Sequence, residues 1–404
     1  MPERERRTAY KRRRRFPWLF TMIVILTAIL IFALVQNQKA GQGSDAQIVE
    51  TRPPYGAQDG DTITIAAAGD LIISQEILNS AFQPNGNYDF SEIFLSVAPL
   101  LSDADLTVAN LETTIAAIPD GENHLAPPSL LTALSDAGVD LLQTANTNSI
   151  YNGLSGLTDT IAAVESAGME AVGTFASRED FKKSGGFTLL DCKGFRVAFV
   201  AFTKGLGNLK VPEGAEYCVN LLYKDYNTTY QEVDTEGIQA VLENVSRARP
   251  DITIALLHWG SEYDTQVSST QKQIQNLLFE HGVDAILGSH SHLTDQVVTR
   301  DGRLTAYSLG NFMASDDARN TEHSLVLKLK FRMDGGKAVL EGYTYEPVYL
   351  AGSDETGDGF RILDTNKTID LYLSDYVDRV SQELYEALLA SREKVDELIH
   401  EVEE

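Results

Sequence analysis

The sequence predicts an α/β fold in which helices cover a sheet, and three observations support this prediction. Short β-branched runs such as residues 62–68 alternate along the chain with helical stretches such as residues 235–248. Polar residues follow directly on several of these runs, as they do where parallel strands end. The chain has 404 residues, 43% of them apolar, which is enough for a substantial core in one large or two ordinary domains. Disorder and a small disulfide scaffold are excluded for the chain as a whole.

The formal net charge of −25 combines a basic N-terminus with an acidic remainder. Residues 1–40 carry nine Lys and Arg against two Asp and Glu, whereas residues 41–404 carry 24 against 56, a net charge of −32. Phosphate binding requires Lys and Arg clustered on the folded domain, so no nucleic-acid partner is expected.

The N-terminus is predicted to anchor the chain in the cell membrane. Residues 1–15 form a basic tip, and the stretch 18–35 contains no charged residue. A helix of that length spans about 27 Å, so we expect a transmembrane signal-anchor over residues 16–36. The positive-inside rule places the tip in the cytoplasm and the main domain outside the cell. A cleaved signal peptide is the alternative, although its apolar region usually has about 7–15 residues.

Residues 37–60 are rich in Gly, Gln, Ser and Asp and are interpreted as a linker. Beyond it, strands are expected over residues 62–68, 105–109, 139–145, 171–173, 195–202, 252–257, 285–287, 304–308 and 324–331. Helices are expected over residues 91–101, 129–137, 157–167, 235–248 and 270–281. The alternation in 324–331 is typical of an edge strand, and residues 324–348 suggest a second, more antiparallel sheet.

The main domain is expected to span residues 61–350, followed by a helical extension over residues 351–404. Within residues 371–402 apolar side chains recur every three or four positions, which predicts an amphipathic helix with room for one break. Cys192 and Cys218 are compatible either with a disulfide in an oxidising compartment or with two buried thiols.

Carboxylates and imidazoles stand just past several predicted strands. In open α/β sheets, ligands bind beyond the carboxyl ends of the strands. Such side chains delivered to one edge suit a divalent metal, and imidazoles favour zinc, manganese or iron over calcium. A single His at a strand end is more often structural, but the pair His290 and His292 beside Gly288 favours function. The predicted metal ligands are Asp70, Glu112, His258, His290 and His292.

Five segments resemble, in order, the motifs of CapA-type capsule and poly-γ-glutamate synthesis proteins. They are residues 68–70 (AGD), 109–114 (ANLETT), 258–263 (HWGSEY), 288–292 (GSHSH) and 308–312 (SLGNF). The fold of that family is similar to that of the calcineurin-like metallophosphoesterases. The resemblance therefore implies a four-layer αββα sandwich, preceded here by one N-terminal transmembrane helix and ending in an amphipathic helical tail. It also implies roles in catalysis for His258, Asn148 and Glu262, and in substrate contact or support of the ligands for Asn110, Trp259 and Asn311.

The sequence departs from this family at residues 145–153. The family pattern Asn-Asn-His is replaced by Asn146-Thr147-Asn148, and the Asp that follows is Tyr151. In the metallophosphoesterases that second Asn binds metal and the His stabilises or protonates the reacting group. Asn148 can donate a hydrogen bond but cannot act as a general acid near pH 7, and loss of such a group typically costs about 10²–10⁴ in rate.

Two hypotheses follow from the resemblance and its departure. The first is a metal-dependent hydrolase or transferase that acts on an anionic surface polymer or its precursor. The second is a non-catalytic accessory subunit of polymer assembly or export, which docks on integral membrane subunits of a polymer synthase. A polyanion would be repelled by the acidic domain, so its binding needs a local positive focus. The metal site, Lys204 and Lys210 are the candidates for that focus.

Overall fold

The computed structural model describes residues 56–316, 318–374 and 380–399. The basic tip, the predicted membrane helix and most of the predicted linker lie outside these residues. Within the described part of the chain, no helix combines the length and the apolar character needed to cross a membrane.

The first sheet contains the strands that come earliest and latest in the sequence. Its parallel half consists of β1 (Thr62–Leu71), β2 (Leu106–Leu111), β5 (Leu141–Gln143) and β6 (Glu170–Val172). On the other side of β1, three antiparallel strands follow: β14 (His323–Asp334), β15 (Lys337–Ala351) and β16 (Arg361–Asp364). The short strand β13 (Asn311–Met313) pairs with the carboxyl end of β1.

The second sheet is formed by the middle of the chain. Its strand order is β11 (Val297–Arg300), β12 (Arg303–Ala306), β10 (Ala285–Ser289), β9 (Ile252–His258), β8 (Phe195–Thr203) and β7 (Thr188–Cys192). The four central strands are parallel, while β7 and β11 are antiparallel edges. The predicted α/β fold is therefore confirmed, with two mixed sheets.

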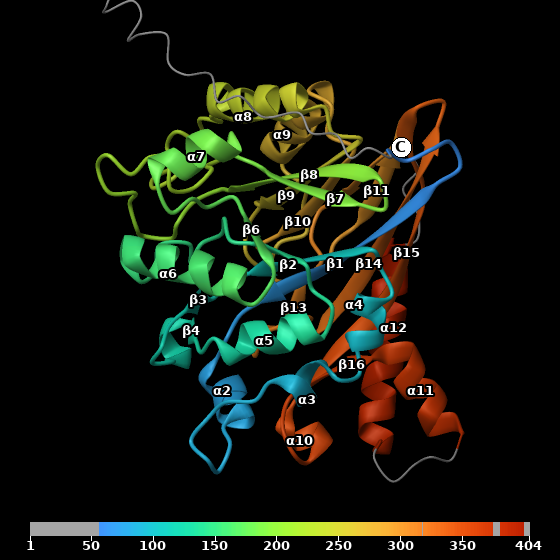
Figure 1. Ribbon diagram of the computed structural model, residues 1–404. Helices are drawn as coiled ribbons and strands as arrows, with labels where there is room; N and C mark the ends of the chain where they lie inside the picture. Colours follow the sequence, from blue (N-terminus) through green and yellow to red (C-terminus); the bar gives the residue numbers. More distant parts are fainter. Residues whose placement is uncertain (1–55, 317, 375–379, 400–404) are drawn as a thin grey trace, which may run out of the picture. The chain divides into compact units, whose positions relative to one another are not determined.

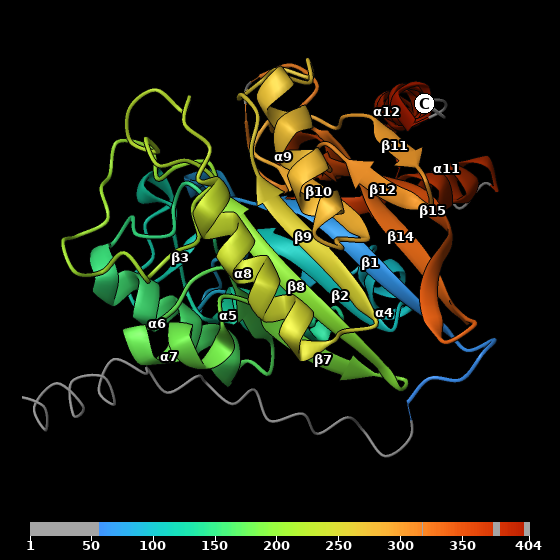
Figure 2. The same ribbon diagram turned by 90° about the horizontal axis from the view of Figure 1, so that it is seen from above.

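Alternate side chains of β1 and β8 show how the layers pack. Ile63 and Ile65 share a buried core with Val197 and Phe199, so this core lies between the two sheets. Residues of opposite orientation in the two strands pack beneath helices on the outer faces. Figures 1 and 2 show α8 and α9 over the second sheet, and Figure 1 shows α5 beneath the first. Full burial of each large aliphatic or aromatic side chain stabilises the fold by about 1.5–3 kcal/mol.

The helices and remaining short elements connect the strands. On the first sheet's side they are α2 (Gln75–Ala81), α3 (Ser91–Phe94), α4 (Ala98–Ser102), α5 (Ser129–Asp136), α6 (Gly153–Ser166), β3 (Thr114–Ile115), β4 (Leu125–Ala126) and the 3₁₀ turn η1 (Gly121–Asn123). The others are α7 (Arg178–Ser184), α8 (Thr235–Ala248), α9 (Ser269–Glu280), α10 (Ser353–Thr356), α11 (Thr365–Leu373) and α12 (Gln382–Ile399).

Each of four parallel strands is preceded by an aspartate that forms two hydrogen bonds to the neighbouring strand. The carboxylate accepts the backbone N–H of a residue on the neighbouring strand, and the aspartate N–H donates to that same residue's carbonyl. The pairs are Asp105 with Thr64, Asp140 with Thr107, Asp251 with Arg196 and Asp284 with Thr253. Because both bonds act on one residue, they set the register at the amino ends of the strands and hence also at the carboxyl ends.

Helix α8 has the predicted bounds, because Asp234 caps its amino end and Arg249 ends it in the left-handed region at φ 49°. The single helix expected over 91–101 is instead α3 and α4, separated at residues 95–97. The edge-strand prediction for 324–331 is wrong, because β14 lies between β1 and β15 inside the first sheet. Likewise, residues 324–348 extend the first sheet and do not form a separate one.

The extension after residue 350 contributes to the first sheet as well as to helices, since β16 pairs with β15. The expected C-terminal helix is described as α11 and α12, and residues 375–379 between them lie outside the described part. Cys192 and Cys218 are free thiols; Cys218 lies in the core between the sheets.

We predict that Asp284→Asn changes the pH dependence of stability. Burial raises the pKa of the Asp284 carboxyl to about 6, above its unfolded value near 4. Its stabilising contribution is therefore complete below about pH 4 and is lost as the pH rises through about 6. Asparagine keeps an acceptor for the Thr253 N–H and has no charge to bury. From pH 4 to pH 7.5 the variant should gain up to about 3 kcal/mol relative to the wild type.

The free energy of unfolding in guanidinium chloride, measured for the full-length chain in one detergent at both pH values, checks this expectation. Asp136→Asn, at an exposed position of α5, serves as the control. An equal effect of Asp284→Asn at the two pH values would show that burial of this charge has no consequence for folding.

Candidate metal centre

The carboxyl ends of strands from both sheets meet at one site. In the first sheet, Asp70 on β1 lies opposite Asn110 on β2 and Asn311 on β13. In the second sheet, His258 at the end of β9 pairs with Ser289, the last residue of β10, so that His290 follows beside it. Strand register thus brings together polar residues as far apart in the sequence as Asp70 and Asn311.

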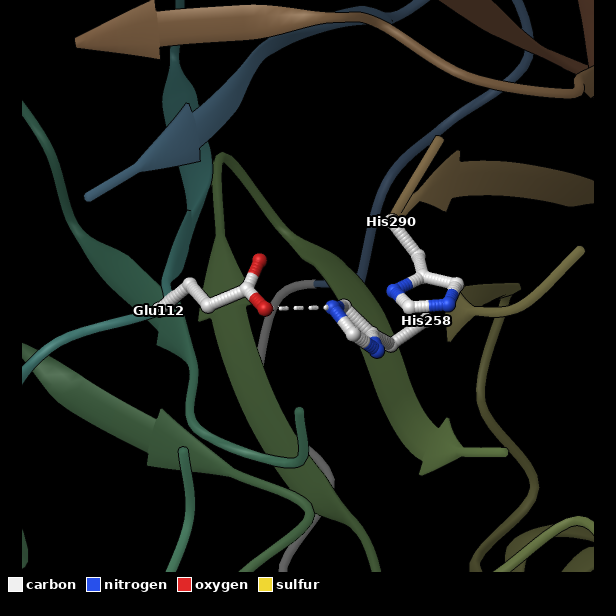
Figure 3. A group of neighbouring side chains, drawn as sticks. All are labelled: Glu112, His258 and His290. Atoms are coloured by element: carbon white, nitrogen blue, oxygen red, sulfur yellow. Dashed lines mark ion pairs between the residues drawn. The ribbon is translucent and has the colours of Figure 1, made fainter. Parts of the chain in front are cut away.

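Glu112, His258 and His290 form the tightest group at this site. Each offers a ligand atom, and these atoms all lie within 4.8 Å of one another. Nε2 of His258 lies 3.0 Å from Oε1 of Glu112, and the rings of His258 and His290 are 4.4 Å apart between centroids. Figure 3 shows the Glu112 carboxylate facing the His258 ring, with the His290 ring beside it. All three residues are buried.

Close backbone approaches hold this arrangement. A Cβ on Gly288 would lie 2.0 Å from the carbonyl oxygen of Tyr307, and one on Gly69 would lie 1.9 Å from that of Gly310. His290 and His292 adopt φ angles of 94° and 61°, in the left-handed region that costs a non-glycine residue on the order of 1–3 kcal/mol. The backbone N–H of His290 faces Oδ2 of Asp70 at 3.4 Å. The segment after β10 is therefore held in a strained form by its surroundings.

The residues present fit a divalent metal. Buried polar atoms normally have hydrogen-bond partners, yet Nε2 of His258, Nδ1 of His290 and Nδ2 of Asn311 have none among the described residues. Although Nε2 of His258 is close to Glu112, the geometry is not that of a hydrogen bond. Two imidazole nitrogens and one carboxylate oxygen make a ligand set typical of zinc and of other borderline transition metals.

Burial and mutual charge decide which protonation states this site favours. Burial raises the pKa of Asp70 to about 6, and the Glu112 carboxylate adds to this effect. Burial opposes ionisation of Glu112 too, but the neighbouring His258, His292 and His124 together outweigh it and lower the pKa. Burial, His258 and Lys204 hold the pKa of His290 well below its usual value. Neutral imidazole and ionised carboxylate are the forms that bind metals.

Asp70 and His292, the other two predicted ligands, border this group. Oδ1 of Asp70 accepts a hydrogen bond of 2.8 Å from Nδ2 of Asn110. Nδ1 of His292 lies 3.0 Å from Oδ1 of Asn311 and 3.8 Å from Oδ2 of Asp70. Burial disfavours a charged His292, but the carboxylates of Glu112 and Asp70, together with Asn311 and Glu262, outweigh it and raise the pKa. All five predicted ligands thus lie at one edge, with Glu112, His258 and His290 in closest contact.

Residues 146–148, where the sequence departs from the family pattern, form hydrogen bonds to residues of the site. Nδ2 of Asn148 donates to the backbone carbonyl of Glu112 at 2.9 Å, so this side chain positions Glu112. Asn146 donates to Oδ1 of Asn110 and accepts from the backbone N–H of Asn148. Asn110 in turn donates to Asp70 and, more weakly, to Glu112. A chain of amide side chains therefore connects residues 146–148 to the carboxylates.

The other predicted residues lie in different surroundings. Trp259 is buried in the core beneath α8 and α9, and its Nε1 donates to the carbonyl of Tyr307. Glu262 is exposed in the loop after β9.

Two residues near the site received no role from the sequence. The ring of Tyr263 lies 5.4 Å from that of His292, and its hydroxyl donates to Asp316. His124 contributes to lowering the pKa of Glu112, and its Nδ1 lies 3.1 Å from the carbonyl of Ile73. Tyr263 stands within the HWGSEY motif, which was the available signal, whereas the loop around His124 carries none.

Comparison with protein families gives a match of residues 64–316 to the family described as bacterial capsule synthesis protein PGA_cap. The chain belongs to this family. The matched segment contains every residue of the candidate metal centre. The capsule synthesis family was the one expected from the five motifs, so that prediction is confirmed.

Similar members of the capsule synthesis family include two proteins from Bacillus. The capsule biosynthesis protein CapA of Bacillus anthracis is 24% identical over 348 residues, which cover 82% of this chain and 76% of that protein. The PGA biosynthesis protein CapA of Bacillus subtilis (strain 168) is 23% identical over 313 residues, 76% of this chain and 75% of the relative.

Among solved structures, the calcineurin-like phosphoesterase YfkN of Bacillus subtilis aligns with 85% of this chain and 100% of its own, at 13% identity and a TM-score of 0.42. A 5'-nucleotidase precursor from Thermus thermophilus aligns with 85% of this chain and 60% of its own, at 14% identity and a TM-score of 0.41. Similarity at this level establishes no activity for the chain.

We predict that the centre binds a transition metal through Glu112, His258 and His290. His290→Ala and Glu112→Gln should each weaken binding at least about tenfold, because loss of even an indirect partner of a metal ligand typically costs 10–100-fold. Elemental analysis of the full-length chain after equilibrium dialysis against Zn²⁺, Mn²⁺ or Fe²⁺ measures this. His281→Ala, at the end of α9, is the matched control and should keep wild-type metal content. Wild-type protein without metal, or variants with unchanged content, would contradict the assignment.

Proposed function

We propose that this protein is a membrane-anchored extracellular member of the capsule synthesis family that performs metal-dependent hydrolysis or transfer on an anionic surface polymer or its precursor. The observation that carries this proposal is the buried group of Glu112, His258 and His290, in which two imidazole nitrogens have no hydrogen-bond partner within the described part of the chain. A site of this kind has a cost in desolvation and backbone strain, and a purely structural role does not explain that cost.

The side chains available to hold the ion are Glu112, His258 and His290, with Asp70 and His292 beside them for a second ion or a wider ligand set. A divalent ion there would supply a Lewis acid and an activated water, the chemistry of metallophosphoesterase-type enzymes. Zinc, manganese and iron all suit this set of donors.

The chain itself provides position and charge. The amide of Asn110 donates to the Asp70 carboxylate and, more weakly, to that of Glu112, while the amide of Asn148 holds the backbone of Glu112. Burial of the ligand side chains excludes bulk water, which strengthens electrostatic interactions within the site. Glu262 and Tyr263 are exposed in the loop after β9, and the Tyr263 ring lies 5.4 Å from that of His292.

The proposed location and partners follow from the sequence. The basic tip and the uncharged stretch 18–35 support a single-pass anchor, with the N-terminus in the cytoplasm and the acidic domain outside. Expected partners are the membrane, an anionic polymer or its precursor, and integral subunits of a polymer synthase. Poly-γ-glutamate is the polymer that the family resemblance favours.

One observation favours the alternative, a non-catalytic accessory subunit. The position at which the family has a His is Asn148, and its amide donates to the backbone of Glu112. The side chain there cannot transfer a proton near neutral pH. A protein of this kind would keep the metal centre and bind the polymer without turning it over.

Turnover and the substitution Asn148→His distinguish the two functions. We expect the metal-loaded, full-length chain to hydrolyse members of a phosphoester and amide panel, and His290→Ala to abolish this. An imidazole at position 148 can keep a donor toward the Glu112 carbonyl while adding a group that titrates near neutral pH. Asn148→His should therefore raise the rate by about tenfold or more.

Steady-state rates at matched metal content provide the measurement, with Asn148→Gln as the control for a change of size. A fully metal-loaded wild type that converts nothing in the panel would reject the enzyme and leave the accessory subunit as the function.

A further inference from the structure

Lys204 is the cation that the fold fixes beside the metal centre. It directly follows β8, and its backbone N–H donates to the carbonyl of His258 at 2.8 Å. Its Nζ donates to the carbonyl of Gly260 and lies 4.8 Å from the centroid of the Tyr230 ring. The backbone N–H and the side-chain ammonium of Lys204 thus both donate hydrogen bonds to residues 258–260, the segment that carries the predicted metal ligand His258.

Strand register places Lys204 at the same edge of the second sheet as the proposed ligands. Thr203 pairs with His258, and His258 pairs with Ser289, so Lys204 and His290 follow neighbouring strand ends. Burial lowers the pKa of Lys204, and the nearby Glu262 partly offsets this. In the described ranges, Lys204 forms no ion pair with a carboxylate. An ammonium has three donors. The Gly260 carbonyl takes one and the Tyr230 ring covers another side of the ammonium, which leaves at least one donor for a ligand.

This cation stands in an environment that otherwise repels anions. Residues 41–404 carry 24 Lys and Arg against 56 Asp and Glu. An anionic chain that approaches such a domain is repelled over distances of about a Debye length, so attraction must come from charges at the site itself. A half-buried ammonium is screened less than an exposed one, which makes Lys204 effective there.

We propose that Lys204 binds an anionic oxygen group of the ligand, a carboxylate or a phosphate, and so sets the site's preference for anionic over neutral ligands. This proposal rests on the proposed function, because it requires the ligand to bind beside the metal centre. The interaction is a charge-assisted hydrogen bond from Nζ. It assigns to the site a specificity residue that lies outside the metal ligands.

A purely structural role for Lys204, that of fixing the loop after β9 through Gly260, predicts a different experimental result. Such a role would affect charged and uncharged ligands alike. The test uses Lys204→Met, which removes the charge, and Lys204→Arg, which keeps it. Lys337→Met, at the exposed first residue of β15, removes one charge elsewhere and is the matched control.

Dissociation constants are measured for the full-length, metal-loaded chain in detergent with three probes. These are a γ-glutamyl oligomer with free carboxylates, the same oligomer with its side carboxyls amidated, and inorganic phosphate. Lys204→Met should weaken binding of the free oligomer, of phosphate or of both by about tenfold or more, as expected for one hydrogen bond to a charged group. Binding of the amidated oligomer should change less than about twofold, and Lys204→Arg, which keeps a charged donor, should lose less affinity for the anions than Lys204→Met.

If Lys204→Met weakens binding of the free oligomer alone, the group that Lys204 binds is a carboxylate. If it weakens binding of phosphate alone, that group is a phosphate. Wild-type protein that binds neither anion, an unchanged Lys204→Met, or an equal loss for the amidated oligomer would each overturn the inference. Metal content is measured on the same samples. If the metal is absent while anion binding still depends on Lys204, the metal-dependent function fails and the recognition role stands.

Discussion

The contact between Glu112 and His258 is the interaction on which the site depends, because it joins the ends of two different sheets. Glu112 follows β2 of the first sheet and His258 ends β9 of the second, yet their side-chain atoms lie 3.0 Å apart. This is possible because the sheets pack face to face through one shared core and their strands end at the same edge. Within each sheet, the aspartates that precede the parallel strands set the strand register from the opposite edge. The strained backbone of His290 then completes the group.

The sequence was sufficient to locate the site but not to describe it. Asp70, Glu112 and His258 could be identified because each follows a buried strand, and parallel strands end at a common edge. The sequence could not show that the Asn148 amide contacts the backbone of Glu112, because this contact depends on how residues 146–148 pack behind β2. It also assigned β14 to an edge, since alternating burial arises equally when one face of an inner strand is only partly covered. Trp259 was expected to contact substrate or support the ligands because it belongs to a motif, whereas its indole is buried in the hydrophobic core.

The amide side chains behind the centre explain how the family motif can change while the site persists. Asn110 and Asn146 still link the carboxylates, so the arrangement of Asp70 and Glu112 does not require a His at position 148. Under the proposed function, metal binding would therefore not depend on a proton-transferring side chain at position 148.

The most direct test of this account is X-ray absorption spectroscopy at the metal edge of the full-length chain loaded with one equivalent of Zn²⁺. The account predicts light-atom ligands at about 2.0–2.1 Å, with the multiple-scattering features of two imidazoles. Each of the variants His258→Ala and His290→Ala should keep the features of only one imidazole, while His281→Ala should keep those of both. A zinc environment without imidazole, or one that is unchanged in the two ligand variants, would contradict the central claim.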